Sequence, residues 1–142
     1  MADVFDVAQY VLAKCGEMSA MKLQKLVYYA QAWHCAWTDN VLFQNRIEAW
    51  KDGPVCPDLW QLHARSYRVS KLRKGDASRL TDDERDTIDR ILAFYGDKSP
   101  QWLSDLTHME DPWREARRGA RDGTPSNAEI SPAAMGRYYS SL

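Results

Sequence analysis

Apolar residues recur every three or four positions over much of the chain, which is the spacing of helices that bury one face. The first such segment is bounded by Asp3, a suitable N-cap, and by Gly16, a suitable stop. Its apolar positions are Val4, Val7, Ala8, Val11 and Leu12. We therefore expect a short amphipathic helix at the start of the chain.

A longer segment follows a second N-cap at Ser19 and continues to about Trp37. It is apolar around most of its circumference, since one face and much of the remainder carry Leu23, Leu26, Val27, Tyr28, Tyr29, Ala30, Ala32, Trp33, His34 and Trp37. A helix with so little polar surface belongs in the interior. The pattern thus predicts a central buried helix.

The pattern changes from helical to alternating between residues 41 and 50. Residues 41–43 and 46–50 predict two short strands that form a small β-hairpin, because Ile47 and Ala49 alternate with Glu48 and Trp50. Gly and Pro in residues 51–54 predict a turn after the second strand.

Beyond this turn, Pro57 can open a short helix with Leu59, Leu62 and His63 on its inner face. The polar stretch 66–80 is rich in Lys and Arg and predicts a mobile surface loop. Residues 122–126 are also predicted to form a loop.

Capping residues locate the remaining helices. Thr81 and Glu84 form a capping box, and a stripe of Ile88, Ile91, Leu92 and Tyr95 follows. Three further helices should begin where a cap precedes proline, at Ser99-Pro100, Asp111-Pro112 and Ser131-Pro132. The sequence therefore predicts a mainly α, single compact domain spanning residues 1–142, with about six or seven short helices around the central buried helix and one small β-hairpin.

Charge and composition narrow the classes of function. The chain has 19 basic and 20 acidic residues, so its net charge of -1 argues against a protein held to a polyanion by its overall field. The six Trp and seven Tyr combine large apolar rings with polar groups, so they suit both a hydrophobic core and a protein interface. No apolar run reaches the length of a membrane span, and no signal segment begins the chain, so we expect a cytoplasmic protein without a membrane partner.

Candidate catalytic and metal-binding residues each have a simpler structural interpretation. Ser104 and His108 could share a helix face, but we favour a helix C-terminus at which the imidazole binds free carbonyls. His34 and Cys35 point about 100° apart on one helix, which favours a core histidine and a buried thiol. Three separated cysteines fit reduced thiols without zinc-type spacing. We expect no catalytic residue, no cofactor and no metal; a hydrolase centred on His108 is the enzymatic hypothesis.

Two clusters of basic residues could contact phosphates. The candidate basic patch consists of Arg65, Arg68, Lys71, Arg73 and Lys74, and a second cluster consists of Arg114, Arg117, Arg118 and Arg121. No helix-turn-helix or aromatic-interleaved basic motif accompanies them, so the sequence disfavours nucleic acid as a partner. A small DNA-binding regulator that controls its own operon stays the alternative function.

Residues 50–57 form the most sharply defined non-helical segment, stiffened by Pro54 and Pro57 and flanked by Trp50 and Trp60. One interpretation is a stiff turn packed under two tryptophans. The other is a rigid aromatic surface for a protein partner, because Trp, Tyr and Arg dominate interface hot spots. Candidate partner-binding residues are Trp50, Asp52, Val55, Trp60, His108, Trp113 and Arg117.

Ordered blocks of residues resemble the Panacea domain of SocA-like antitoxins, a phage-associated family, over about residues 5–140. The first half carries the blocks Met-Lys-Leu-Gln-Lys-Leu-Val-Tyr-Tyr-Ala-Gln-Ala-Trp-His at 21–34, Leu42-Phe43, Ile47-Glu48-Ala49-Trp50 and Gly53-Pro54-Val55. The second half carries Leu103-Ser104, Leu106-Thr107-His108, Glu110, Pro112-Trp113, Ala116-Arg117, Ile130-Ser131 and Tyr138-Tyr139.

The resemblance implies a mainly helical, non-enzymatic antitoxin encoded in bacteria or their prophages. Such proteins neutralise a cognate toxin, encoded nearby, by direct protein–protein binding. The founding member of the family is a proteolytic adaptor, which adds a ClpXP-type protease as a second expected partner. The chain departs from the family pattern at Asp52, where an aromatic residue often precedes Gly-Pro, and at Cys56, where a small aliphatic residue is usual.

Overall fold

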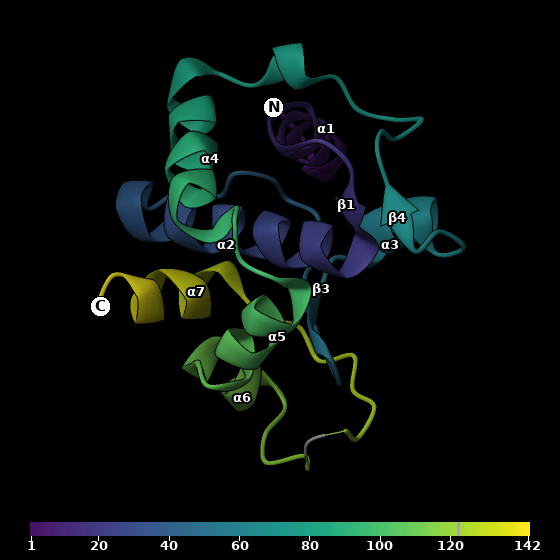
Figure 1. Ribbon diagram of the computed structural model, residues 1–142. Coiled ribbons are helices and arrows are strands. Elements are labelled where there is room, and N and C mark those ends of the chain that lie inside the picture. The colour runs from purple at the N-terminus through teal and green to yellow at the C-terminus, as the bar shows by residue number, and fades with distance from the viewer. Residues whose placement is uncertain (122) are drawn as a thin grey trace.

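Helix α2 (Ala20–Thr38) crosses the middle of the computed structural model, which describes residues 1–121 and 123–142. Helices α1 (Val4–Cys15) and α4 (Asp82–Tyr95) lie on one side of α2, and α5 (Pro100–His108), α6 (Asp111–Ala116) and α7 (Pro132–Tyr139) lie on the other (Figure 1). Asp122, which begins the predicted loop 122–126, lies outside the described residues. Among the helices described, none has the length and apolar character of a membrane span.

The remaining elements are short. They are strands β1 (Met18–Ser19), β2 (Glu48–Trp50), β3 (Gly53–Val55) and β4 (Arg68–Val69), the helix α3 (Pro57–His63) and the 3-10 turn η1 (Ala77–Arg79). Seven α-helices and one small antiparallel hairpin, β2–β3, thus occupy the described residues, which confirms the predicted mainly α fold.

Helix α2 is buried as its pattern predicted, because it packs against α1, α4, α5 and α7. Leu23, Leu26, Val27 and Ala30 have no exposed surface. The prediction that Trp37 lies on the same buried face is wrong, since 41% of this residue is exposed. It lies in the last turn of α2, where the Arg90 guanidinium of α4 lies 4.0 Å from the centroid of its ring and covers it only in part.

Side-chain caps begin the helices where the sequence placed them, with one exception. Asp3, Ser19, Thr81, Ser99 and Ser131 each accept hydrogen bonds from backbone amides of the first turn. The predicted cap at Asp111 is wrong, because Glu110 occupies the N-cap position of α6 and makes no side-chain cap. Its carboxylate accepts instead from the Tyr29 hydroxyl at 2.7 Å and the Tyr139 hydroxyl at 2.8 Å.

The hairpin differs from the predicted one in its strands. Strand β2 pairs with β3, so the turn is Lys51-Asp52 and the predicted turn residues Gly53 and Pro54 belong to the second strand. Residues 41–43 are not a strand, because the side chain of Gln31 forms hydrogen bonds with their backbone. Its side-chain amide donates to the Phe43 carbonyl at 2.7 Å, and its side-chain oxygen accepts from the Leu42 amide at 2.7 Å.

Residues 66–80 are tied to the body of the molecule at several places, in contrast to the predicted loop. Strand β4 pairs with β1, and the Gln9 side chain donates to the Leu72 carbonyl at 2.7 Å. Gly75 has φ 102°, and a Cβ there would lie 2.3 Å from the Phe5 carbonyl oxygen. The buried side chains of Val69, Leu72 and Leu80 explain this anchoring. The prediction of a mobile loop missed it because most other residues of this stretch are polar.

A buried tyrosine cluster joins α2 to α7 and to the start of α6. The Tyr29 ring stacks on Tyr95 at 4.2 Å, and the hydroxyls of Tyr28 and Tyr139 lie 3.0 Å apart. Burial raises the pKa of Glu110 above its ordinary value, while the hydrogen bonds from Tyr29 and Tyr139 oppose that rise.

Replacing Gln31 by Met should destabilise the fold by about 2–4 kcal/mol, because the Leu42 amide and the Phe43 carbonyl would be buried without partners. Chemical denaturation followed by circular dichroism measures this loss. Gln61→Met, at an exposed position of α3, is the matched control and should change the free energy of unfolding by under about 0.5 kcal/mol. Equal effects of the two substitutions would contradict the role assigned to Gln31.

Glu110 should make the fold less stable as the pH rises. Above the ordinary carboxyl pKa of 4.5, the unfolded chain loses a proton that folded Glu110 keeps until its raised pKa is passed. The native state then binds more protons, so the stability contributed by Glu110 falls across this window. The free energy of unfolding of the wild type relative to Glu110→Gln should therefore decrease as the pH rises above 4.5. An increase would refute the direction of the shift.

Candidate functional site

Side chains of α5 and α6 hold the backbone of the β2–β3 hairpin, so the two candidate contact segments of the sequence meet in space. The Arg117 guanidinium donates to the Ala49 carbonyl at 3.0 Å, and the Trp113 indole donates to the Trp50 carbonyl at 2.8 Å. The Ser104 hydroxyl donates to the Asp52 carbonyl at 2.7 Å. We call the hairpin together with these donors and the adjoining helix α3 the hairpin site.

His108 contributes a further tie between α5 and the hairpin. Its Nε2 lies 3.1 Å from the Lys51 carbonyl oxygen, and its Nδ1 lies 2.6 Å from the Ser104 carbonyl oxygen. A carbonyl only accepts, so a ring nitrogen that carries a proton donates to the carbonyl it faces. His108 is the last residue of α5 and faces one carbonyl of that helix, as the sequence interpretation expected, but the second carbonyl belongs to the hairpin turn.

Lys25 of α2 lies beneath the hairpin with 2% of its surface exposed. Its ammonium donates to the Pro54 carbonyl at 3.1 Å. Burial lowers the pKa of Lys25 to about 8, although the carboxylate of Asp52 acts in the opposite direction. Gly53 is required above it, because φ is 123° and a Cβ would lie 2.5 Å from the Lys25 Cε.

A cleft of about 280 Å³ opens between the hairpin and helix α3. Trp50 and Trp60 form one wall, with their ring centroids 5.7 Å apart and their planes at 61°. Gln24 closes the inner side, where its side-chain nitrogen lies 2.9 Å from Nε2 of His63. The cleft therefore combines aromatic walls with a hydrogen-bonded interior.

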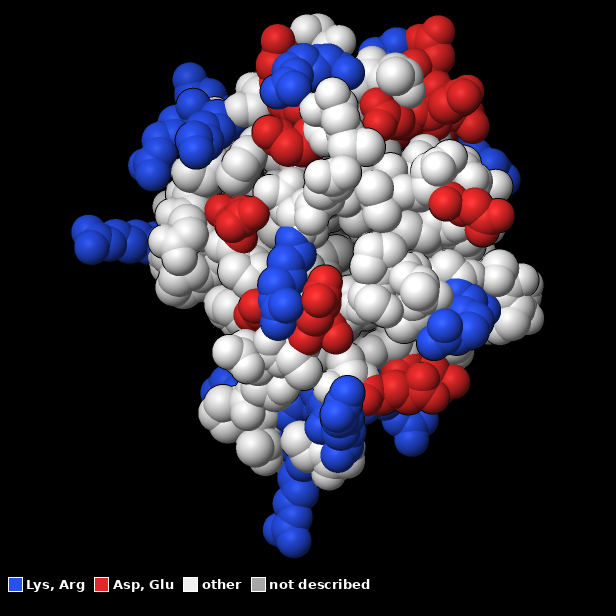
Figure 2. Space-filling model, turned by 180° about the vertical axis from the view of Figure 1, so that it is seen from behind, with Lys and Arg blue, Asp and Glu red and all other residues white. Residues whose placement is uncertain are grey.

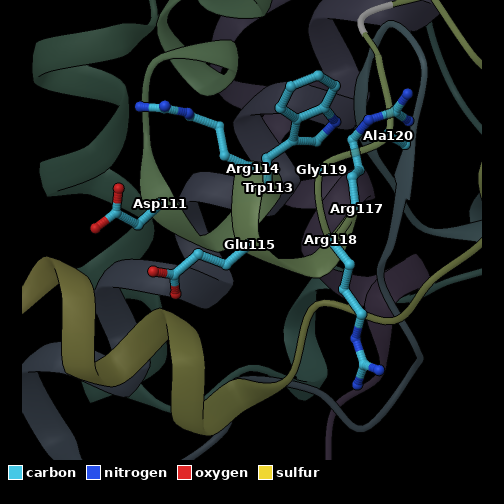
Figure 3. A pocket seen from close by; sticks show the side chains of 8 residues that line it. All are labelled: Asp111, Trp113, Arg114, Glu115, Arg117, Arg118, Gly119 and Ala120. Carbon is cyan, nitrogen blue, oxygen red and sulfur yellow. The ribbon is translucent and has the colours of Figure 1, made fainter.

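The predicted partner-binding residues divide into a surface set and a buried set. Asp52 is exposed, 37% of Trp60 is exposed, and Trp50 and His108 are half-buried. Val55, Trp113 and Arg117 are buried. Figure 3 shows Trp113 and Arg117 extending to the same side of their segment, consistent with their hydrogen bonds to the hairpin. Those three residues position the surface, and the first four form it.

Three arginines of the second basic cluster, Arg114, Arg117 and Arg118, extend in different directions (Figure 3). Arg118 extends in the opposite direction from Arg117, and Arg114 extends to another side of the cleft of about 480 Å³ that they line (Figure 3). Because the Arg117 guanidinium donates to hairpin and loop carbonyls, it does not form a common phosphate-binding surface with Arg114 and Arg118.

All five residues of the candidate basic patch, Arg65, Arg68, Lys71, Arg73 and Lys74, are exposed. Arg68 pairs with Glu17 at 2.8 Å, and the Lys74 ammonium lies 5.1 Å above the Phe5 ring. Figure 2 shows basic and acidic side chains interspersed over the back of the molecule around a largely uncharged centre. The Glu17 carboxylate therefore weakens the field of this patch at Arg68.

The residues with catalytic potential are engaged in structural contacts. The Ser104 hydroxyl donates to a backbone carbonyl, and the His108 ring faces two carbonyl oxygens. Nδ1 of His34 lies 2.8 Å from the Thr87 hydroxyl. Burial raises the pKa of Cys35 and of Cys56 to about 11, so both thiols keep their protons at neutral pH.

Sequence reasoning missed Lys25 and Gln24, two polar residues of α2 that support the site. A lysine in an amphipathic helix is ordinarily assigned to the solvent side. The available signal was the near absence of a polar face on this helix, which leaves no solvent side for Lys25 to occupy.

Comparison with known families matches residues 23–114 to the family described as antitoxin SocA-like, Panacea domain. The matched span begins in α2 and ends in α6, so it includes the hairpin and α5. It is shorter than the span 5–140 over which the sequence resembles that family, and it confirms the resemblance. Neither a curated protein nor a solved structure gives a match.

Lys25 should contribute more stability at alkaline pH than at neutral pH. Between its folded pKa of about 8 and the ordinary 10.5, the unfolded chain binds a proton that the folded protein lacks. Stability therefore rises with pH in this window. The free energy of unfolding of the wild type relative to Lys25→Met should gain about 3 kcal/mol across it. Lys71→Met is the control at an exposed lysine, and a constant difference for Lys25→Met would contradict the prediction.

Proposed function

This chain belongs to the family of SocA-like antitoxins with a Panacea domain, and we propose that it neutralises a cognate toxin by binding it directly. Family membership is the observation that carries the proposal. The proposed partner is a toxin protein encoded near the gene of this chain.

The hairpin site supports the proposal because it offers a rigid surface with aromatic side chains. Hydrogen bonds from α2, α5 and α6 fix the hairpin backbone before any partner arrives. A preorganised surface loses less conformational entropy on binding. Trp60 and Trp50 supply the residue type that most often forms interface hot spots. We therefore assign Trp50, Asp52, Trp60 and His108 as toxin contacts.

We also propose that neutralisation requires no reaction catalysed by this chain. The Ser104 hydroxyl and the His108 ring are engaged with backbone carbonyls, which supports a structural role for this pair. His108→Gln should accordingly weaken neutralisation no more than the loss of one contact does, and should not abolish it, when the fold is intact.

The decisive experiment expresses the adjacent gene with and without this protein and measures growth. We expect the neighbouring product to stop growth alone and to be harmless when both are present. A pull-down of the purified pair tests direct binding. A neighbour that is equally harmful or equally harmless in both cells would refute the proposal. The toxin level in the rescued cells separates masking, which leaves it unchanged, from delivery to a protease, which lowers it.

Trp60→Ala should weaken toxin binding about 10–100-fold, because an exposed tryptophan would be removed from the centre of the contact surface. Isothermal titration calorimetry measures the dissociation constant, and the circular dichroism spectrum checks the fold. Trp60→Phe keeps an aromatic ring and should lose less affinity. Unchanged affinity in folded Trp60→Ala would exclude Trp60 from the interface.

A further inference from the structure

Four of the largest exposed apolar side chains gather along one groove of about 650 Å³ between α2, α4, α5 and the end of α7. The exposed fractions are 41% for Trp37, 59% for Phe94, 42% for Trp102 and 71% for Leu142. Scattered apolar residues on a surface are ordinary, but a contiguous group marks an interaction site. This groove is formed by residues outside the hairpin site.

The floor of the groove is already ordered. Trp33 lies along it, and its indole donates to the Tyr95 hydroxyl at 3.0 Å. The rings of Trp33 and Trp37 are 5.3 Å apart, and Phe94 packs edge-to-face on Tyr95 at 4.7 Å. Ile91 and Leu106 complete the apolar lining. A ligand would therefore enter a preformed apolar channel.

Two cations lie over the aromatic rings of this groove. The Arg90 guanidinium is 4.0 Å from the Trp37 ring centroid, and the Lys98 ammonium is 5.2 Å from the Trp102 ring centroid. Lys98 also lies 3.7 Å from the exposed Asp97 carboxylate, whereas Arg90 makes no ion pair with any residue that the structure describes. The apolar channel thus carries positive charge beside it.

We propose that this groove binds a segment of the toxin in which large apolar side chains are flanked by carboxylates; this inference rests on the proposed antitoxin function. Burial of the apolar side chains supplies the attraction, and carboxylates placed near Arg90 and Lys98 supply specificity. A second copy of this chain fits less well. In a two-fold contact centred on the groove, Arg90 and Lys98 would face the same cations of the partner copy.

Helix α5 connects this groove to the hairpin site. Trp102 and Leu106 face the groove, while Ser104 and His108 of the same helix hold the hairpin. In Figure 1, α5 accordingly lies between α7 and β3. A toxin that occupies both surfaces would enclose α5 from two sides.

The test compares the affinity of the purified toxin from the adjacent gene for the full-length wild type and for two variants, Phe94→Glu and Arg90→Glu. Both side chains are largely exposed, so the melting temperature should change little. We expect each variant to weaken binding at least about tenfold. Arg73→Glu repeats the charge reversal outside the groove, and this control should retain wild-type affinity.

Each outcome assigns the groove. If the wild type binds the toxin and both variants bind equally well, the groove inference is overturned while the proposed function stands. If the wild type does not bind the toxin, the proposed function itself fails. Sedimentation of the protein alone tests whether a second copy occupies the groove. If the wild type is a dimer, if Phe94→Glu is a monomer and if its toxin affinity is unchanged, the groove binds a second copy and the inference is overturned.

Discussion

Most of helix α2 is enclosed by other segments, so water cannot satisfy its buried polar side chains and each of these needs a partner within the protein. This constraint organises the molecule. Gln31 fixes the extended chain at Leu42 and Phe43, and His34 binds Thr87 on α4. Lys25 supports the hairpin, and Tyr29 reaches Glu110 at the start of α6. The polar residues of one buried helix therefore decide where four other segments lie.

The same constraint explains why the hairpin can present a defined surface although it has only six residues in strands. An isolated hairpin of this size is marginal in water. Here its carbonyls accept from side chains of three helices, and the Trp50 and Trp60 rings pack against each other outside them. The buried donors give rigidity, while the exposed aromatic edges and Asp52 are available to a partner.

Local signals and long-range partners account for the successes and failures of sequence-based prediction. Caps such as Thr81 and Ser99 act within one helical turn, so the starts of these helices could be predicted. The prediction of a strand at 41–43 was wrong because the side chain of Gln31, a residue of α2, forms hydrogen bonds with the backbone there. The prediction of a cap at Asp111 was wrong because Glu110 is the N-cap residue, and its carboxylate binds distant tyrosines instead of capping the helix. The sequence could predict each of the two contact segments separately. It could not predict that they lie together, because this depends on hydrogen bonds between distant residues that no local pattern encodes.

The span of those hydrogen bonds affects how the protein is made. Residues 49–52 are synthesised well before their donors, since Ser104, His108, Trp113 and Arg117 follow them by 52, 57, 63 and 68 positions. A chain still emerging from the ribosome has the hairpin sequence but lacks the groups that hold it. Contacts between distant residues form slowly because loop closure must precede them. The hairpin site is therefore completed late in biosynthesis, after α5 and α6 have left the ribosome.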